Sequence, residues 1–153
     1  MGNRESGKRP HEHLEVWKDA MHLVEAVYKH SAHFPDAERY ALLQQVRRSA
    51  ISVPSNIAEG AARRSRAEYL RFLSIARGSL AEPGTQLQIA ERLDYAPHHP
   101  ELAHHVDRTF ARLTALMNSL SRTPPHAAAA HSTVTRSSDS PLPIPNSHPT
   151  HDR

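Results

Sequence analysis

Histidine is the side chain with the widest chemical range in this sequence, which contains 13 histidines and no cysteine. His98, His99, His104 and His105 lie close together, and Glu101 precedes His105 by four residues, so that these two side chains can share one face of a helix. Imidazole and carboxylate groups arranged in this way can hold a zinc ion. However, no His-Glu-x-x-His string and no histidine spacing with a matching acid completes a site. We therefore expect surface histidines and no cofactor or metal.

Arginine offers a second kind of chemistry, because it is concentrated in the middle of the chain. Residues 47 to 77 include seven arginines and two glutamates, whereas the formal net charge of the whole chain is only +3. Such a concentration suits a polyanion, because each neutralised phosphate releases counterions and adds affinity that does not depend on sequence. Arginine also populates solvated helix faces without binding a ligand, and the count alone does not separate the two interpretations. The candidate nucleic-acid-binding residues are Arg47, Arg48, Arg63, Arg64, Arg66, Arg71 and Arg77.

Four amphipathic segments must position these side chains, since apolar residues recur in each at alternating spacings of three and four. In the first segment, which begins near Glu12, the expected inward residues are Leu14, Trp17, Met21, Val24 and Tyr28, with Ala20 and Val27 widening the stripe. In the second they are Leu43, Val46, Ala50, Val53 and Ile57. In the third they are Tyr69, Leu73, Ala76, Leu80, Pro83, Leu87 and Ala90, and in the fourth Leu102, Val106, Phe110, Leu113, Met117 and Leu120.

The second segment carries several signals for where a helix begins and ends. We expect it to run from about Ala37 to Glu59, with Asp36 as the N-cap. Pro54 lies inside the periodic run and predicts a kink, because proline removes a backbone donor and crowds the preceding turn. Gly60 is expected to supply the positive φ that commonly ends a helix.

The third segment begins with Ser65 and Glu68, which fit a capping box, and ends near Leu93. Pro83 and Gly84 interrupt it at mid-length. Leu80 and Leu87 keep the same phase on the two sides of this interruption, so we predict one kinked helix rather than two helices.

These segments predict an all-α fold, an antiparallel up-down-up-down four-helix bundle over residues 12–122. Residues 1–11 and the Pro/Ser/His-rich residues 123–153 are expected to be disordered tails. No run of about 18 apolar residues occurs, so we expect a soluble, cytoplasmic protein without a membrane partner. Four apolar residues lie off the inward stripes and predict an oligomer interface, namely Ile51, Leu70, Ile75 and Ile89.

Several strings in residues 12–122 resemble the four helix bundle protein family, which includes the proteins encoded in intervening sequences of bacterial 23S ribosomal RNA genes. They are L-E-V-W-K-D-A at 14–20, F-P at 34–35, Q-V-R-R-S-A-I-S-V-P-S-N-I-A-E-G at 45–60 with Arg63 after it, I-A-R-G-S-L-A-E at 75–82 and T-Q-L at 85–87. Pro83 departs from the family pattern, which has leucine there, and Ala62 stands where glycine is frequent.

The resemblance implies a homo-oligomer, specifically a pentameric ring. It also implies kinship with the accessory subunit of diversity-generating retroelements, a bundle with a basic surface that binds nucleic acid and a reverse transcriptase. Arg47 or Arg48, together with Arg63, occupy the family's basic positions. Asn56, Glu59 and Gly60 belong to its most recognisable string, and we expect Asn56 and Glu59 to be structural, satisfying backbone groups near Pro54 and the helix end.

An enzymatic alternative rests on Arg92 and His98, which have five residues between them and resemble the Arg-x(4–6)-His motif of HEPN-type ribonucleases. In such a site the histidine would deprotonate a 2′-hydroxyl and the arginine would stabilise the phosphorane. That family carries the motif on a helix, whereas His98 lies in a proline-flanked loop. We therefore expect a non-enzymatic oligomeric bundle that binds RNA or DNA through its arginines. The alternative is a protein-interaction scaffold or accessory subunit without nucleic-acid binding.

Overall fold

The computed structural model describes residue 7 and residues 9–122. The elements in chain order are the 3-10 helix η1 (Pro10–His13), helix α1 (Glu15–Ser31), the 3-10 helix η2 (Asp36–Glu38), and helices α2 (Leu42–Ala61), α3 (Arg66–Arg92) and α4 (Pro100–Arg122). No strand occurs within these described residues, which confirms the all-α class. The tail expected at 123–153 lies outside them. Pro10 and His11, which we assigned to the disordered N-terminal segment, lie in η1, where the His11 ring is 5.1 Å from that of Trp17.

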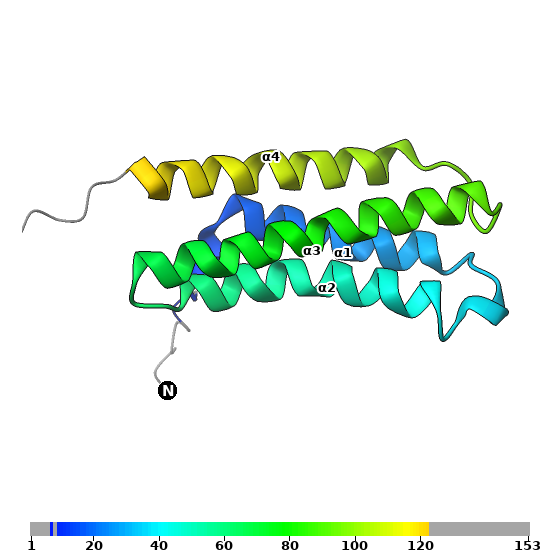
Figure 1. The fold of residues 1–153 in the computed structure, drawn as a ribbon, viewed down its shortest axis with the longest axis horizontal. Coiled ribbons are helices and arrows are strands. Elements are labelled where there is room, and N and C mark those ends of the chain that lie inside the picture. Colours follow the sequence, from blue (N-terminus) through cyan, green and yellow to red (C-terminus); the bar gives the residue numbers. More distant parts are fainter. Residues whose placement is uncertain (1–6, 8, 123–153) are drawn as a thin grey trace, which may run out of the picture.

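The four long helices lie side by side, and their connections alternate between the two ends of the bundle, so that successive helices run in opposite directions (Figure 1). Each helix contacts the one before it and the one after it, and α4 returns to contact α1. The antiparallel neighbours follow from the short connections. The bundle therefore has a closed ring of four helices around one core.

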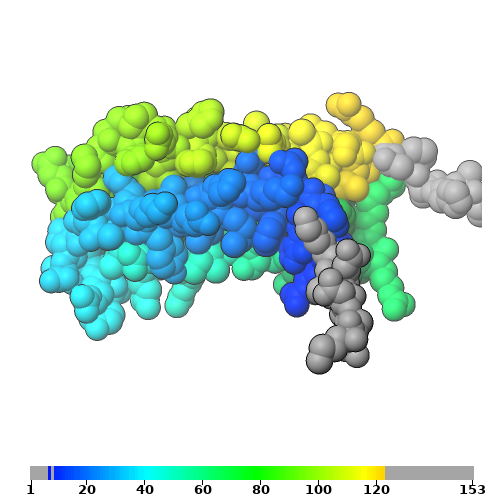
Figure 2. Space-filling view, turned by 180° about the vertical axis from the view of Figure 1, so that it is seen from behind, coloured from blue at the N-terminus to red at the C-terminus, as the bar shows by residue number. Residues whose placement is uncertain are grey.

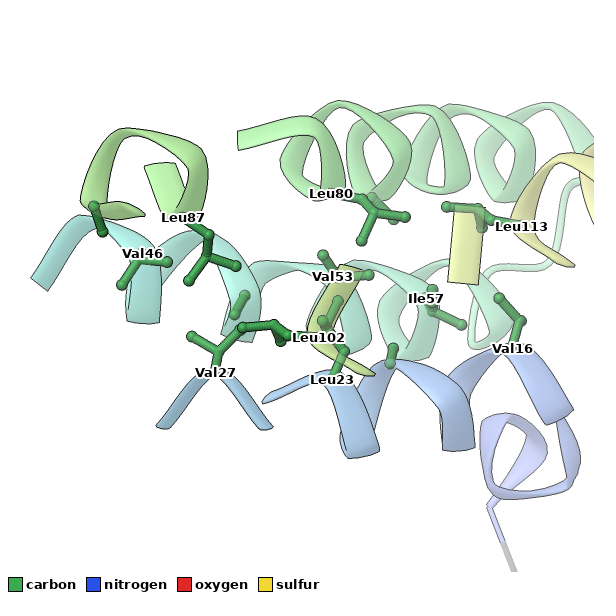
Figure 3. Close-up of a cluster of buried hydrophobic side chains, with 14 of the residues drawn as sticks. Val16, Leu23, Val27, Val46, Val53, Ile57, Leu80, Leu87, Leu102 and Leu113 are labelled. Atoms are coloured by element: carbon green, nitrogen blue, oxygen red, sulfur yellow. The ribbon is translucent and has the colours of Figure 1, made fainter. Parts of the chain in front are cut away.

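The core is formed by aliphatic side chains from all four helices (Figure 3). Val46, Val53 and Ile57 of α2 and Leu80 of α3 are fully buried, at the positions that the apolar spacing predicts. Each such side chain stabilises the folded state by about 1.5–3 kcal/mol relative to an exposed one. The inward faces of α2 and α3 are thus predicted correctly from sequence.

The buried face of α1 differs from the expected one. Val16 and Leu23 are buried, together with the widening residues Ala20 and Val27, whereas Met21 and Tyr28 are 37% and 40% exposed. The apolar pattern is displaced because two polar residues, Asp19 and His30, lie on the buried face. The buried face of α1 therefore contains a carboxylate and an imidazole, whereas the apolar spacing predicts only apolar side chains there.

Asp19 is held by α4. Its carboxylate lies 3.3 Å from Arg108 Nε and 2.9 Å from Arg112 Nη1, the latter an ion pair whose angles are not those of a hydrogen bond. Asp19 is only 5% exposed, so two cations meet one buried carboxylate at the contact between α1 and α4. These two ion pairs link α1 to α4, and Asp19 has no other charged partner among the described residues.

On α4, the expected inward residue Phe110 is 44% exposed, and its neighbour Thr109 is fully buried instead. Thr109 can lie in the core because its hydroxyl donates to the His105 carbonyl at 2.7 Å. A hydroxyl that is satisfied within its own helix buries little unpaired polarity.

The beginning of α2 also differs from the prediction. Asp36 opens η2, and α2 begins only at Leu42, whose amide donates to Glu38 Oε2 at 3.2 Å. The other oxygen of Glu38 accepts from the Tyr95 hydroxyl at 3.1 Å, and this hydrogen bond raises the pKa of Tyr95. The predicted N-cap Asp36 is therefore wrong: Ala41 is the N-cap, and Glu38 satisfies the first amide of α2 and ties it to the connection between α3 and α4.

The expectations for α3 are largely confirmed. Ser65 is the N-cap, and its Oγ accepts from the Glu68 amide at 3.2 Å. The predicted capping box is only half formed, because the Glu68 carboxylate accepts from the Ser65 hydroxyl instead of the Ser65 amide. One helix continues through Pro83, whose ring is buried. Likewise, α2 continues through Pro54.

Candidate nucleic-acid interface

Gly60 governs how closely α2 and α3 approach each other. A Cβ atom at this position would lie 2.9 Å from Phe72 Cβ and 2.9 Å from Tyr69 Cδ2 on α3. The prediction that Gly60 ends the helix with a positive φ is wrong, since no glycine among the described residues has a positive φ and α2 runs on to Ala61. Glycine is required here because any side chain would press on α3. Burial at this contact also raises the pKa of Tyr69.

A line of small polar side chains continues this close contact along α2 and α3. Ser49 Oγ donates to Gln86 Oε1 at 3.0 Å, and the hydroxyls of Ser52 and Ser79 lie 3.0 Å apart. The Asn56 amide donates to the Ser52 carbonyl at 2.8 Å and to its hydroxyl at 3.0 Å. These bonds are of the kind that a structural role for Asn56 predicts, and they satisfy the polar groups that the close contact buries.

Four arginines lie at the end of this helix pair where α2 turns into α3, next to Gly60. Arg63 Cζ lies 4.7 Å and Arg71 Cζ 5.6 Å from the centre of the Phe72 ring, so two guanidinium groups lie against one aromatic ring. Arg63 also pairs with Glu59, which places that glutamate on the surface rather than at a backbone group. We call Arg63, Arg64, Arg66 and Arg71 the turn cluster. Three of its members are exposed, and Arg66, the first residue of α3, is half-buried.

Arg47 and Arg48 lie elsewhere, because they precede Arg63 by about fifteen residues, or roughly 22 Å along a helix axis. Arg47 Nε donates to Ser31 Oγ at 2.9 Å, and its guanidinium lies 4.6 Å from the centre of the Tyr28 ring. Arg47 is thus engaged by α1, and Arg48 beside it is exposed. Arg77 is half-buried near the middle of α3.

The seven predicted arginines therefore do not form one patch. The structure brings four of them together at the α2–α3 turn and separates the other three along the bundle. Arg47, which we expected to contact nucleic acid, has its side chain committed to packing between α1 and α2.

Sequence analysis missed a cleft of about 450 Å³ beside Arg47 and Arg48, which Tyr28, Arg39 and Tyr40 also line. Tyr40 falls inside the predicted second helix but off its apolar stripe, so the sequence pattern assigns it no role. The signal that could have found it is the turn-forming string Phe34-Pro35-Asp36, which delays the start of α2 and leaves Tyr40 in the connection.

A second cleft, of about 400 Å³, lies between α1 and the start of α4 and is lined by five histidines. The rings of His30 and His99 are 5.4 Å apart, and neither His30 Nε2 nor His99 Nδ1 has a hydrogen-bond partner in the described structure. Burial, followed by the neighbouring His99 and His33, lowers the pKa of His30, with Glu91 acting in the opposite direction. Within residues 9–122, no three histidine or acidic side chains are grouped so that they could hold a metal ion.

Arg92 and His98, the ribonuclease-like pair, lie on either side of the end of α3. Arg92 is the last residue of that helix, and His98 follows in the loop, where its Nδ1 is 3.1 Å from both carboxylate oxygens of Glu91. His98 is thus directed towards a carboxylate.

The model of the family described as 23S rRNA-intervening sequence protein matches residues 12–119, which is most of the chain. No curated protein matches the sequence. Among the described residues, no helix has both the length and the apolarity needed to span a bilayer.

Proposed function

The chain belongs to the 23S rRNA-intervening sequence protein family, and we propose that it is a non-enzymatic, self-associating helical bundle that binds RNA or DNA through phosphates. The turn cluster is the observation that carries this proposal. Its four arginines lie within nine residues of one another along the chain, and three are exposed at one end of the bundle. Guanidinium groups presented in this way are suited to phosphate oxygens, which they bind with two parallel hydrogen bonds.

The ion pairs within the cluster do not cancel its charge. Arg63 pairs with Glu59, but both side chains reach solvent, and an exposed pair of this kind contributes little stability. A phosphate can therefore displace the glutamate at a small energetic cost. The guanidinium groups of Arg63 and Arg71 both lie against the Phe72 ring, which orders them at the turn.

Self-association is supported by apolar side chains that the bundle leaves uncovered. Ile75 and Ile89 are 40% and 42% exposed and lie two heptads apart on α3, whereas Ile51 on α2, also 42% exposed, lines the cleft beside Arg47 and Arg48. Exposed aliphatic residues aligned along one helix suit a second copy of the same surface. This row also favours the alternative function, a scaffold for another protein such as a reverse transcriptase, in which the arginines serve only for solvation.

Binding of a labelled duplex DNA and a labelled structured RNA, measured by fluorescence anisotropy at two salt concentrations, tests the proposal. The variant replaces Arg63, Arg64 and Arg71 with alanine. Its matched control combines Lys29→Glu with Arg92→Ala, at two exposed cations near the opposite end of the bundle, so that both proteins lose the same net charge.

We expect the wild-type protein to bind and its affinity to fall steeply with salt. The turn variant should bind less tightly, with a salt slope on duplex DNA reduced by up to about 2.7, or roughly 0.9 for each lost phosphate contact. The control should change much less. Absence of binding at low salt would favour the scaffold, and equal losses in both variants would remove the turn cluster from the interface.

A further inference from the structure

The cleft beside the start of α2 combines aromatic and cationic side chains in a way that the fold does not require. It lies between the second half of α1 and the first turns of α2, and its volume of about 450 Å³ is in the range of small-molecule sites. Two tyrosines and three arginines line it, together with two aliphatic residues and one amide. Figure 2 shows the segment from which Tyr40 and Arg39 come, in cyan, at the margin of the face formed by α1 and α4.

Tyr40 is the most exposed large apolar side chain of the described residues, at 83%. Tyr28 on α1 is 40% exposed, and Arg47 lies against its ring. A tyrosine that is fully solvated contributes little to the core and presents an amphipathic ring to a partner. Tyr28, by contrast, is fixed, because Arg47 is itself anchored to Ser31.

The charged side chains that line the cleft are all positive. None of its eight lining residues is acidic, and three are arginines. Arg39 contacts Asp36 at 3.4 Å, but both side chains are largely in solvent, so this pair does not neutralise the cleft. Arg48 is exposed at the same edge. Negative charge is therefore attracted to the rim of a pocket that has aromatic rings.

We propose that this cleft binds an unpaired nucleotide of single-stranded RNA or DNA, with the base against the Tyr40 ring and the flanking phosphates on Arg39 and Arg48. Aromatic rings next to a cationic groove are the combination that single-stranded nucleic acid recognises. A duplex cannot use this site, since its bases are stacked inside the helix. The inference rests on the proposed nucleic-acid binding, and adds that the protein prefers unpaired strands over duplexes.

A short single strand that carries one 2-aminopurine provides the test, because stacking quenches the fluorescence of this base. Its binding is compared with that of a duplex of the same sequence for four proteins: wild type, Tyr40→Ala, Tyr40→Phe, and Phe110→Ala as a control at an exposed aromatic residue of α4. Circular dichroism checks that each variant is folded, which we expect because both positions are solvated.

We expect Tyr40→Ala to weaken single-strand binding by roughly 5-fold to 150-fold and to abolish the quenching, with duplex binding unchanged. Tyr40→Phe keeps the ring and should behave as wild type, as should Phe110→Ala. If wild type binds neither nucleic acid, the proposed function fails and this site fails with it. If wild type binds but Tyr40→Ala retains single-strand affinity and quenching, the nucleotide site at this cleft is wrong while the proposed function stands.

Discussion

Replacing Gly60 with alanine tests the contact that holds α2 against α3. The new Cβ would lie 2.9 Å from Phe72 Cβ, an atom fixed to the α3 backbone, as well as 2.9 Å from Tyr69 Cδ2. Neither distance is compatible with ordinary van der Waals contact, so α3 or its side chains must shift. Gly78 offers a matched control, because it lies inside α3 and a Cβ there would meet nothing within 4 Å.

The expected magnitudes follow from two opposing terms. Alanine is favoured over glycine inside a helix by about 1 kcal/mol, and Gly78→Ala should gain approximately that stability. Overpacking a close contact costs about 1–3 kcal/mol. Gly60 is one residue from the end of α2, where helix propensity counts for less. We therefore expect Gly60→Ala to be destabilising, with a free energy of unfolding about 2–4 kcal/mol below that of Gly78→Ala.

Urea unfolding followed by circular dichroism measures this difference, and thermal unfolding should show it as roughly 4 °C for each kcal/mol. The wild-type midpoint should lie between those of the two variants. If Gly60→Ala raises the midpoint as much as Gly78→Ala does, α3 does not press on Gly60, and the explanation of the close helix contact is wrong.

Two further predictions concern buried polar residues of α1. Asp19→Asn removes the negative charge that Arg108 and Arg112 share, and it should lower the free energy of unfolding by about 1–3 kcal/mol. The loss is smaller than for a fully buried ion pair, because both arginines reach solvent. Urea unfolding measures the difference, and an unchanged midpoint would contradict the prediction. Burial and His99 lower the pKa of His30, so the folded state resists protonation. Its contribution to stability is complete above about pH 6.5, the ordinary histidine pKa, and is lost as the pH falls from there towards the lowered pKa. His30→Leu should flatten the fall of the urea midpoint between about pH 7.5 and about pH 5.5, whereas an unchanged pH profile would show that other groups cause it.

The sequence predicts the fold most accurately where buried positions are apolar without interruption. The inward face of α3, and that of α2 apart from the buried Ser49, are of this kind, and their apolar core residues lie where the spacing places them. On α1 and α4 the buried faces contain Asp19, His30 and Thr109. Each of them has a specific partner: an arginine of α4 for Asp19, the His99 ring for His30, and a backbone carbonyl for Thr109. The spacing of apolar residues along the chain does not reveal such partners, because they lie on other helices or on the backbone.

The candidate site is less predictable for a related reason. Sequence concentration marks the arginines, but it does not say which of them face solvent. Arg47 and Arg48 are adjacent, yet one is bonded to Ser31 on another helix and the other is exposed. The position of Tyr40 depends on where α2 begins, and helix boundaries are the least certain part of a prediction from sequence.

The string from Gln45 to Gly60, through which the family resemblance is most specific, is mainly a packing motif. Its small residues let α3 approach, with Ser52 against Ser79 and Gly60 against Phe72. This contact also positions the Phe72 ring on which Arg63 and Arg71 lie. A change at Gly60 therefore reaches the turn cluster without altering any arginine, because it moves the ring that supports two of them. Packing in the motif and the basic surface beside it are consequently coupled through one aromatic side chain.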